Sequence, residues 1–210
     1  MDVKSTYTDG ARRIASRSMT GLARTRLTPS MLTAAGVSTC ILASVLVYFE
    51  YRNEWLFFWA GSIVFAIGSI MDILDGALAR AGGKATVFGA FLDSTLDRVG
   101  EAFMLGAIAV AFARDGNETA LMFTFAAMAG SFLVSYTRSK AETLGLKGDI
   151  GIGSRAERVV VICLGLAVAP WGGLQWAIYI LAATAWVTVW SSVTRVCATS
   201  TSTSACGMTP

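Results

Sequence analysis

The chain has 210 residues, of which 54% are hydrophobic and 15% are charged, against about 25% charged residues in an average soluble domain. This composition excludes an ordinary soluble domain and predicts a single bundle of membrane-spanning α-helices. The net charge of +3 is too small to indicate a nucleic-acid partner. Because the chain contains no histidine, a general base must be a carboxylate, a lysine, a tyrosine or a cysteine.

The first segment, residues 1–28, is polar and basic and is expected to form a cytoplasmic arm. Within it, residues 8–25 predict an amphipathic helix on the membrane surface, because apolar residues share one side and several arginines supply charge. A merely solvated arm is the alternative. At the other end, residues 199–210 are rich in serine and threonine, and we expect this tail to be disordered.

Residues 29–198 are expected to form the transmembrane domain. A spanning helix needs roughly 20 mostly apolar residues. We place six such helices, the fifth of them short, at residues 29–49, 55–80, 86–113, 119–143, 156–170 and 174–197. The predicted fold class is therefore all-α integral membrane, with six transmembrane helices preceded by an N-terminal amphipathic interfacial helix.

Lysine and arginine are concentrated in alternate connections. They are frequent before the first predicted span, between the second and third, and between the fourth and fifth, whereas the other connections carry only Arg52 and Arg114. Because cytoplasmic loops carry an excess of these residues, we expect both termini in the cytoplasm and a multi-pass protein of the plasma membrane. An even number of spans fits this orientation.

Four aspartates lie near the cytoplasmic ends of the second and third predicted spans. Asp72 and Asp75 are three residues apart and Asp93 and Asp97 are four apart, so each pair shares one face of its helix. A short turn joins the two helices, and we expect them to be antiparallel neighbours whose carboxylates converge. Isolated charges are costly within a membrane, and a divalent cation would offset both that cost and the mutual repulsion. Oxygen-only ligands favour Mg²⁺, Mn²⁺ or Ca²⁺ over zinc.

Two alternatives accompany this interpretation. The aspartates could instead pair with nearby arginines to stabilise the bundle, although Arg80 and Arg98 are too few for four carboxylates. A second question concerns three small residues beside the aspartates, Gly76, Ala79 and Gly89. Because they have little or no side chain, a flat ligand can approach the backbone there. Close helix packing through small residues is the other reading of these three positions.

The complete pattern resembles the signature of the CDP-alcohol phosphotransferases, with all eight positions present: Asp72-x2-Asp75-Gly76-x2-Ala79-Arg80-x8-Gly89-x3-Asp93-x3-Asp97. The resemblance implies a membrane enzyme of phospholipid synthesis. Such an enzyme transfers a phosphatidyl-type group from a CDP-linked lipid, CDP-diacylglycerol, to an alcohol and releases CMP. It also implies a homodimer.

The resemblance also implies roles for single residues. Asp72, Asp75, Asp93 and Asp97 would hold Mg²⁺ or Mn²⁺. Asp93 and Asp97 would be catalytic, with Asp97 as general base on the acceptor hydroxyl; a purely metal-binding Asp97 is the alternative. The CDP pocket would be lined by Gly76, Ala79, Arg80, Gly89 and Thr33.

General chemistry supports the same assignment independently of the resemblance. A bound metal neutralises the diphosphate and stabilises the leaving CMP. Phosphoryl transfer depends mostly on positioning and electrostatics, and a weakly nucleophilic alcohol benefits from a nearby carboxylate base. Glu101, one turn beyond Asp97, is expected to pair with Arg98 rather than to extend the metal site.

Several cations near the same cytoplasmic mouth favour an anionic, phosphorylated polyol acceptor. The candidates are Ser135, Arg138, Arg155, Arg158 and Arg195. The stretches "SYTRSKAE", "SRAERVV" and "LDSTLDR" are similar to those of phosphatidylinositol phosphate synthases, whose acceptor is inositol phosphate. Two positions depart from that branch: it commonly has lysine where Arg138 stands, and its last-span arginine lies about one turn before Arg195.

Two other functions remain open at this point. A phosphatidylglycerophosphate synthase would use glycerol 3-phosphate, but that branch usually has proline where Ser94 follows Asp93. A divalent-cation transporter is the alternative from another class, since carboxylates within spans often mark ion paths. The four aspartates, however, lie at one membrane face, and the chain shows no inverted repeat.

Overall fold

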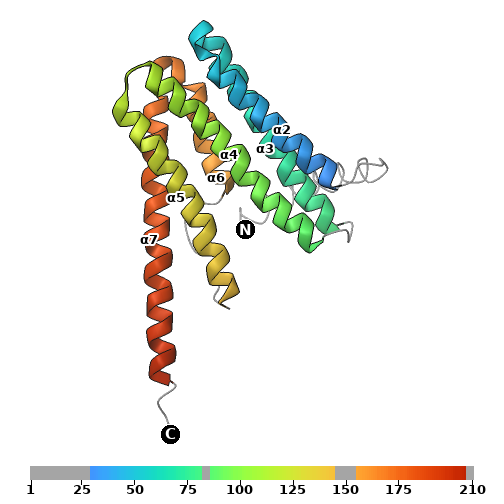
Figure 1. The fold of residues 1–210 in the computed structure, drawn as a ribbon, viewed down its shortest axis with the longest axis vertical. Coiled ribbons are helices and arrows are strands. Elements are labelled where there is room, and N and C mark those ends of the chain that lie inside the picture. The colour runs from blue at the N-terminus through green and yellow to red at the C-terminus, as the bar shows by residue number, and fades with distance from the viewer. Residues whose placement is uncertain (1–28, 82–85, 145–154, 207–210) are drawn as a thin grey trace, which may run out of the picture.

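The computed structural model describes residues 29–81, 86–144 and 155–206, and the side chains of 33–72, 86–144 and 155–196. These residues form helices and no strand (Figure 1). The helices are α2 (Pro29–Tyr48), α3 (Glu54–Ala81), α4 (Val87–Arg114), α5 (Glu118–Thr143), α6 (Arg155–Ala167) and α7 (Leu174–Cys206), with short 3₁₀ turns η1 (Glu50–Arg52) and η2 (Ala169–Trp171). The predicted arm and amphipathic helix of residues 1–28 lie outside this description.

Each of the six predicted spans corresponds to one observed helix. Within the described part of the chain, four stretches are long and apolar enough to cross a membrane, namely Thr33–Arg52, Glu54–Asp72, Glu118–Thr143 and Leu174–Val196. The chain is therefore a helical membrane protein. Of the other two helices, α4 has 28 residues but carries several charges in its first half. The 13 residues of α6 span only about 20 Å, less than the roughly 30 Å of the hydrocarbon core.

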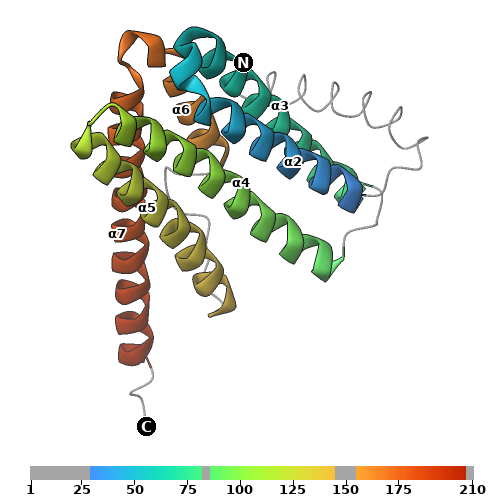
Figure 2. The ribbon, with the colours of Figure 1, turned by 45° about the horizontal axis from the view of Figure 1, so that its top comes forward.

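The helices form one bundle, in which α2 packs against both α3 and α4, and α5 packs along α7 (Figures 1 and 2). The short α6 packs against α3 and α7. Among the described residues, α3 and α4 are joined mainly through α2 rather than through each other. The core between the helices is apolar, and includes the fully buried Met104, Leu105 and Ile108 of α4.

Small residues bring α2 close to its two neighbours. A Cβ atom added to Gly68 of α3 would lie 2.9 Å from Cys40 Sγ and 3.0 Å from the Gly36 carbonyl oxygen, both on α2. On the α4 side, a Cβ added to Gly100 would lie 3.3 Å from Cys40 Cβ. Glycine therefore sets the spacing of both contacts, as is common between membrane helices.

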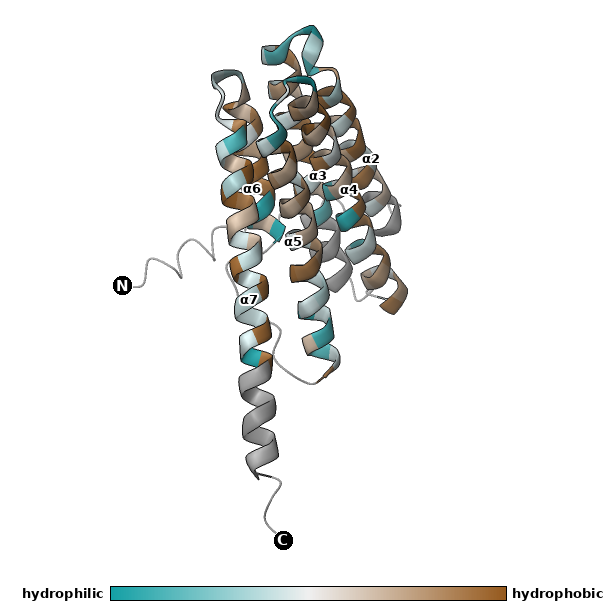
Figure 3. Cartoon of the chain, turned by 60° about the vertical axis from the view of Figure 1, so that its left-hand side comes forward, coloured by the Kyte–Doolittle hydropathy of each residue, from teal (hydrophilic) through white to brown (hydrophobic). Residues whose placement is uncertain are grey.

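The distribution of hydropathy suits a lipid environment: the upper parts of the helices are mostly apolar, and polar residues lie at the upper turns and in the lower parts of α5 and α7 (Figure 3). Aromatic side chains gather at the turns opposite the aspartates. Trp55 and Trp171 pack edge to face there, with ring centroids 4.7 Å apart. Trp176 at the start of α7 is 63% exposed. Tryptophan at the end of a span is typical of a membrane–water interface.

The last helix is longer than the sequence predicts. It continues to Cys206, past the expected end at residue 197, and so covers most of the 199–210 segment for which we expected disorder. Helix elongation adds one backbone hydrogen bond per residue once a packed turn exists. Hydroxyls are also satisfied within α7: those of Thr188 and Ser192 donate to carbonyl oxygens four residues earlier, at 2.7 and 2.9 Å.

Candidate functional site

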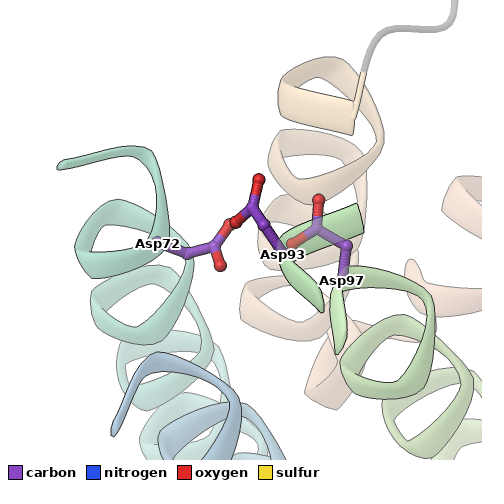
Figure 4. Close-up of side chains that lie close together, drawn as sticks. All are labelled: Asp72, Asp93 and Asp97. Atoms are coloured by element: carbon purple, nitrogen blue, oxygen red, sulfur yellow. The ribbon is translucent and has the colours of Figure 1, made fainter. Parts of the chain in front are cut away.

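Three of the predicted aspartates converge between α3 and α4. Asp72 near the cytoplasmic end of α3 is buried, with 4% of its surface exposed, and Asp93 and Asp97 lie in the first turns of α4. One carboxylate oxygen from each lies within 4.8 Å of the other two. Their side chains point toward one another (Figure 4). The predicted convergence is thus confirmed for these three residues.

Local sequence fixes where α4 begins and therefore where its aspartates point. Thr86 is the N-cap, and its hydroxyl oxygen accepts a hydrogen bond of 3.0 Å from the backbone N–H of Gly89. A capping threonine satisfies a backbone donor that the first turn leaves unpaired. Gly89 lies one turn before Asp93, so the cap sets the register in which Asp93 and Asp97 face α3.

The donor set fits a divalent cation. Three carboxylates this close repel one another unless a positive charge lies among them. Oδ1 of Asp72 is buried and has no hydrogen-bond partner among the described residues, which is costly for a carboxylate oxygen. An all-oxygen set of this kind suits Mg²⁺, Mn²⁺ or Ca²⁺.

The remaining predicted CDP and metal residues are placed only in part. Asp75, Gly76, Ala79 and Arg80 belong to the last turns of α3, but their side chains lie outside the described part of the chain. Thr33 is buried on α2, one turn before Gly36.

Arg155, the first residue of α6, reaches into the aspartate cluster. Its Nη1 atom pairs with Oδ2 of Asp72 and lies 2.8 Å from Oδ1 of Asp97. The space left beside these groups is about 10 Å³, enough for roughly one water molecule. The sequence predicts Arg155 at the acceptor phosphate; the structure places its guanidinium directly against two of the carboxylates.

Arg158 is held by a different acid. Its guanidinium donates from Nε and Nη2 to the two oxygens of Glu101, at 2.8 and 3.0 Å. The prediction that Glu101 pairs with Arg98 is therefore wrong. Arg98 instead donates to the carbonyl oxygen of Ser94 on its own helix. Glu101 is buried and faces α6, where Arg158 offers a geometry that matches both carboxylate oxygens.

This pair was missed although the sequence carries a signal for it. Asp97 and Glu101 are four residues apart on α4, and Arg155 and Arg158 are three apart on α6. Each pair therefore lies along one helix face, and the two faces carry opposite charge.

Ser135 and Arg138 contact residues of their own helix. The hydroxyl of Ser135 donates to the carbonyl oxygen of Ser131 at 3.2 Å. Nε of Arg138 lies 3.4 Å from Oε1 of Glu142, and both side chains are about half exposed. Arg195 is exposed on α7. Among the five predicted residues, Arg155 has its guanidinium against two of the aspartates.

Comparison with known proteins agrees with this site. Residues 26–197 match the family model described as CDP-alcohol phosphatidyltransferase. The chain is 38% identical over 169 residues to the archaetidylinositol phosphate synthase of Pyrococcus horikoshii, covering 80% of this chain and 82% of that protein. It is 34% identical over 161 residues to the phosphatidylinositol phosphate synthase of Mycolicibacterium smegmatis, covering 75% and 70%.

Solved structures show the same fold. The phosphatidylinositol phosphate synthase of Mycobacterium tuberculosis with CDP-DAG bound has a TM-score of 0.75 and 26% identity, covering 86% of this chain and 92% of that one. A structure of the same enzyme in complex with manganese and citrate has a TM-score of 0.74 and 27% identity, covering 85% and 87%.

Proposed function

The chain belongs to the CDP-alcohol phosphatidyltransferase family, and we propose that it transfers the phosphatidyl group of CDP-diacylglycerol to inositol phosphate. The products are phosphatidylinositol phosphate and CMP. The observation that carries this proposal is the convergence of three carboxylates within 4.8 Å beside an arginine. The names of the relatives support the acceptor.

In this proposal Asp72, Asp93 and Asp97 hold Mg²⁺ or Mn²⁺, and Asp75 completes the set. A bound cation would neutralise the diphosphate and the negative charge on the departing CMP. Gly76, Ala79, Arg80, Gly89 and Thr33 are assigned to the CDP moiety. We assign the transfer mainly to positioning and electrostatics, as phosphoryl transfer requires.

Asp97 is assigned as the base that takes the proton of the acceptor hydroxyl. It lies one helical turn after Asp93 on α4, and the guanidinium of Arg155 lies 2.8 Å from its Oδ1 atom. A carboxylate within reach of the reacting hydroxyl can serve as its general base. Asp93 contributes a second carboxylate at the reacting centre.

The acceptor phosphate is assigned first to Arg155, because its guanidinium already lies at the aspartates and can form two parallel bonds to a phosphate. Ser135, Arg138 and Arg195 are further candidates. Arg158 is a weaker candidate, since Glu101 occupies its Nε and Nη2 donors.

We also propose a plasma-membrane protein with six spans, both termini in the cytoplasm, and a homodimeric state. The aspartates lie at the opposite end of the helices from the exposed Trp55, Trp171 and Trp176, which supports a fixed orientation. An open apolar groove of about 410 Å³ between α2 and α4, lined by Val45, Tyr48, Phe103 and Val110 among others, is assigned to an acyl chain.

The deciding experiment is an acceptor panel. The purified protein in lipid receives CDP-diacylglycerol and Mg²⁺, and CMP release is measured with inositol phosphate, glycerol 3-phosphate, serine and free inositol. CMP release with inositol phosphate supports the proposal if it is lost in Asp93→Asn and kept in the control Asp115→Asn, at the far end of α4. Release with glycerol 3-phosphate instead would keep the site and change the acceptor.

A cation transporter is tested with the same protein in proteoliposomes. The proposal predicts CMP release without net metal flux. Metal flux in the absence of CMP release would replace the transferase with a transporter.

A further inference from the structure

Glu101 and Arg158 form a buried charged pair that the proposed chemistry does not use. Their surfaces are 8% and 7% exposed, and two hydrogen bonds of 2.8 and 3.0 Å join them. Burying two charges is costly, so such a pair is weak evidence for stability alone. Its place in the fold indicates another purpose.

The pair lies one helical turn from the aspartate cluster on both helices. On α4, Glu101 follows Asp97 by four residues, and on α6, Arg158 follows Arg155 by three. The two helices therefore meet through successive ion pairs: Arg155 with Asp97, then Arg158 with Glu101. The second is more deeply buried and better aligned, because both carboxylate oxygens accept.

Two ion pairs between long side chains join α6 to α4. The backbone of α6 packs against α3 and α7, and approaches α4 at few points. Arg155 is the first residue of α6, so the position of its guanidinium depends on where the helix lies. A small shift of a helix end by about 1 Å is enough to misplace a catalytic contact.

We propose that Glu101 is a positioning residue: by binding Arg158 through both carboxylate oxygens, it holds α6 against α4 and so keeps the Arg155 guanidinium beside the aspartate cluster, within reach of the acceptor phosphate. Direct metal binding by Glu101 fits less well, because Arg158 engages both of its oxygens. The proposal rests on the proposed function in one respect, the assignment of Arg155 to the acceptor phosphate.

The test compares Glu101→Gln with Glu118→Gln. The first change keeps the shape of the side chain but removes the charge that binds Arg158. The second removes an equal charge from an exposed residue in the first turn of α5, at the far end of the molecule. We expect Glu101→Gln to raise KM for inositol phosphate by about tenfold, as for a lost charged hydrogen-bond partner, and to leave KM for CDP-diacylglycerol nearly unchanged.

Two further measurements distinguish a positioning role of Glu101 from a purely structural one. Glu101→Asp retains the charge on a shorter side chain, and its acceptor KM should lie between those of the wild type and Glu101→Gln. The rate at which an arginine-directed dicarbonyl reagent modifies Arg155, read by mass spectrometry, should rise several-fold in Glu101→Gln as the guanidinium leaves the carboxylates, and stay unchanged in Glu118→Gln.

The outcomes separate this inference from the proposed function. Unchanged Arg155 reactivity, or an equal loss for both substrates with a lower Tm, shows a merely structural pair and overturns the inference while the transferase stands. Increased Arg155 reactivity in a protein that uses none of the tested acceptors supports the positioning role and overturns the proposed function. If neither Glu101 variant folds, faster modification of Arg155 in Arg158→Lys supports the inference, and an unchanged rate overturns it.

Discussion

Replacing Arg155 with glutamine should strengthen metal binding while weakening catalysis. In the structure the Arg155 guanidinium occupies the carboxylates to which we assign the divalent cation, pairing with Asp72 and lying 2.8 Å from Asp97. The two kinds of positive charge therefore compete for the same oxygens. Removing one should raise the affinity for the other, although the acceptor phosphate loses its assigned partner.

The magnitude follows from the geometry. A hydrogen bond to a charged group contributes about 1.5 to 3 kcal/mol. The side chains of Arg155 and Asp97 are 27% and 21% exposed, so solvent screening favours the lower end of that range. About 1.4 kcal/mol corresponds to a roughly tenfold lower Kd for the cation.

The assay is a titration with Mn²⁺ in detergent without substrates, in which electron paramagnetic resonance reports the free ion. Arg52→Gln is the matched control, because it removes the same charge from an exposed residue in η1, at the opposite end of the helices from the aspartates. Mn²⁺ affinity that is unchanged or weaker in Arg155→Gln would refute the idea that this guanidinium and the cation share a site.

Two other predictions concern the base and the helix packing. Asp97→Asn should lower kcat for CMP release by about 10²–10⁴-fold, the usual contribution of a positioned base, with Asp115→Asn as control. Gly68→Leu should destabilise the fold by about 1–3 kcal/mol through overpacking, because its Cβ would lie 2.9 Å from Cys40 Sγ. A lower Tm in detergent would show this; Gly106→Ala, whose Cβ meets nothing within 4 Å, should leave Tm nearly unchanged.

The helices themselves were predictable because their signals are local. Apolar runs of spanning length and the Thr86 cap depend on residues close together in the chain. The same holds for the pairing of Asp93 with Asp97 on one face, which follows from helical periodicity alone. The end of α7 was not predictable, since a serine- and threonine-rich composition is compatible with both a disordered tail and a helix.

The contacts within the site depend on how the helices cross. The sequence by itself determined the candidate residues, the four aspartates and the arginines after them. Only the tertiary structure decided that Arg155 lies against Asp72 and Asp97, and that Glu101 binds Arg158 rather than Arg98. Helix spacing is set by glycines far apart in the chain, and the choice among several arginines depends on distances of a few ångströms that no local pattern encodes.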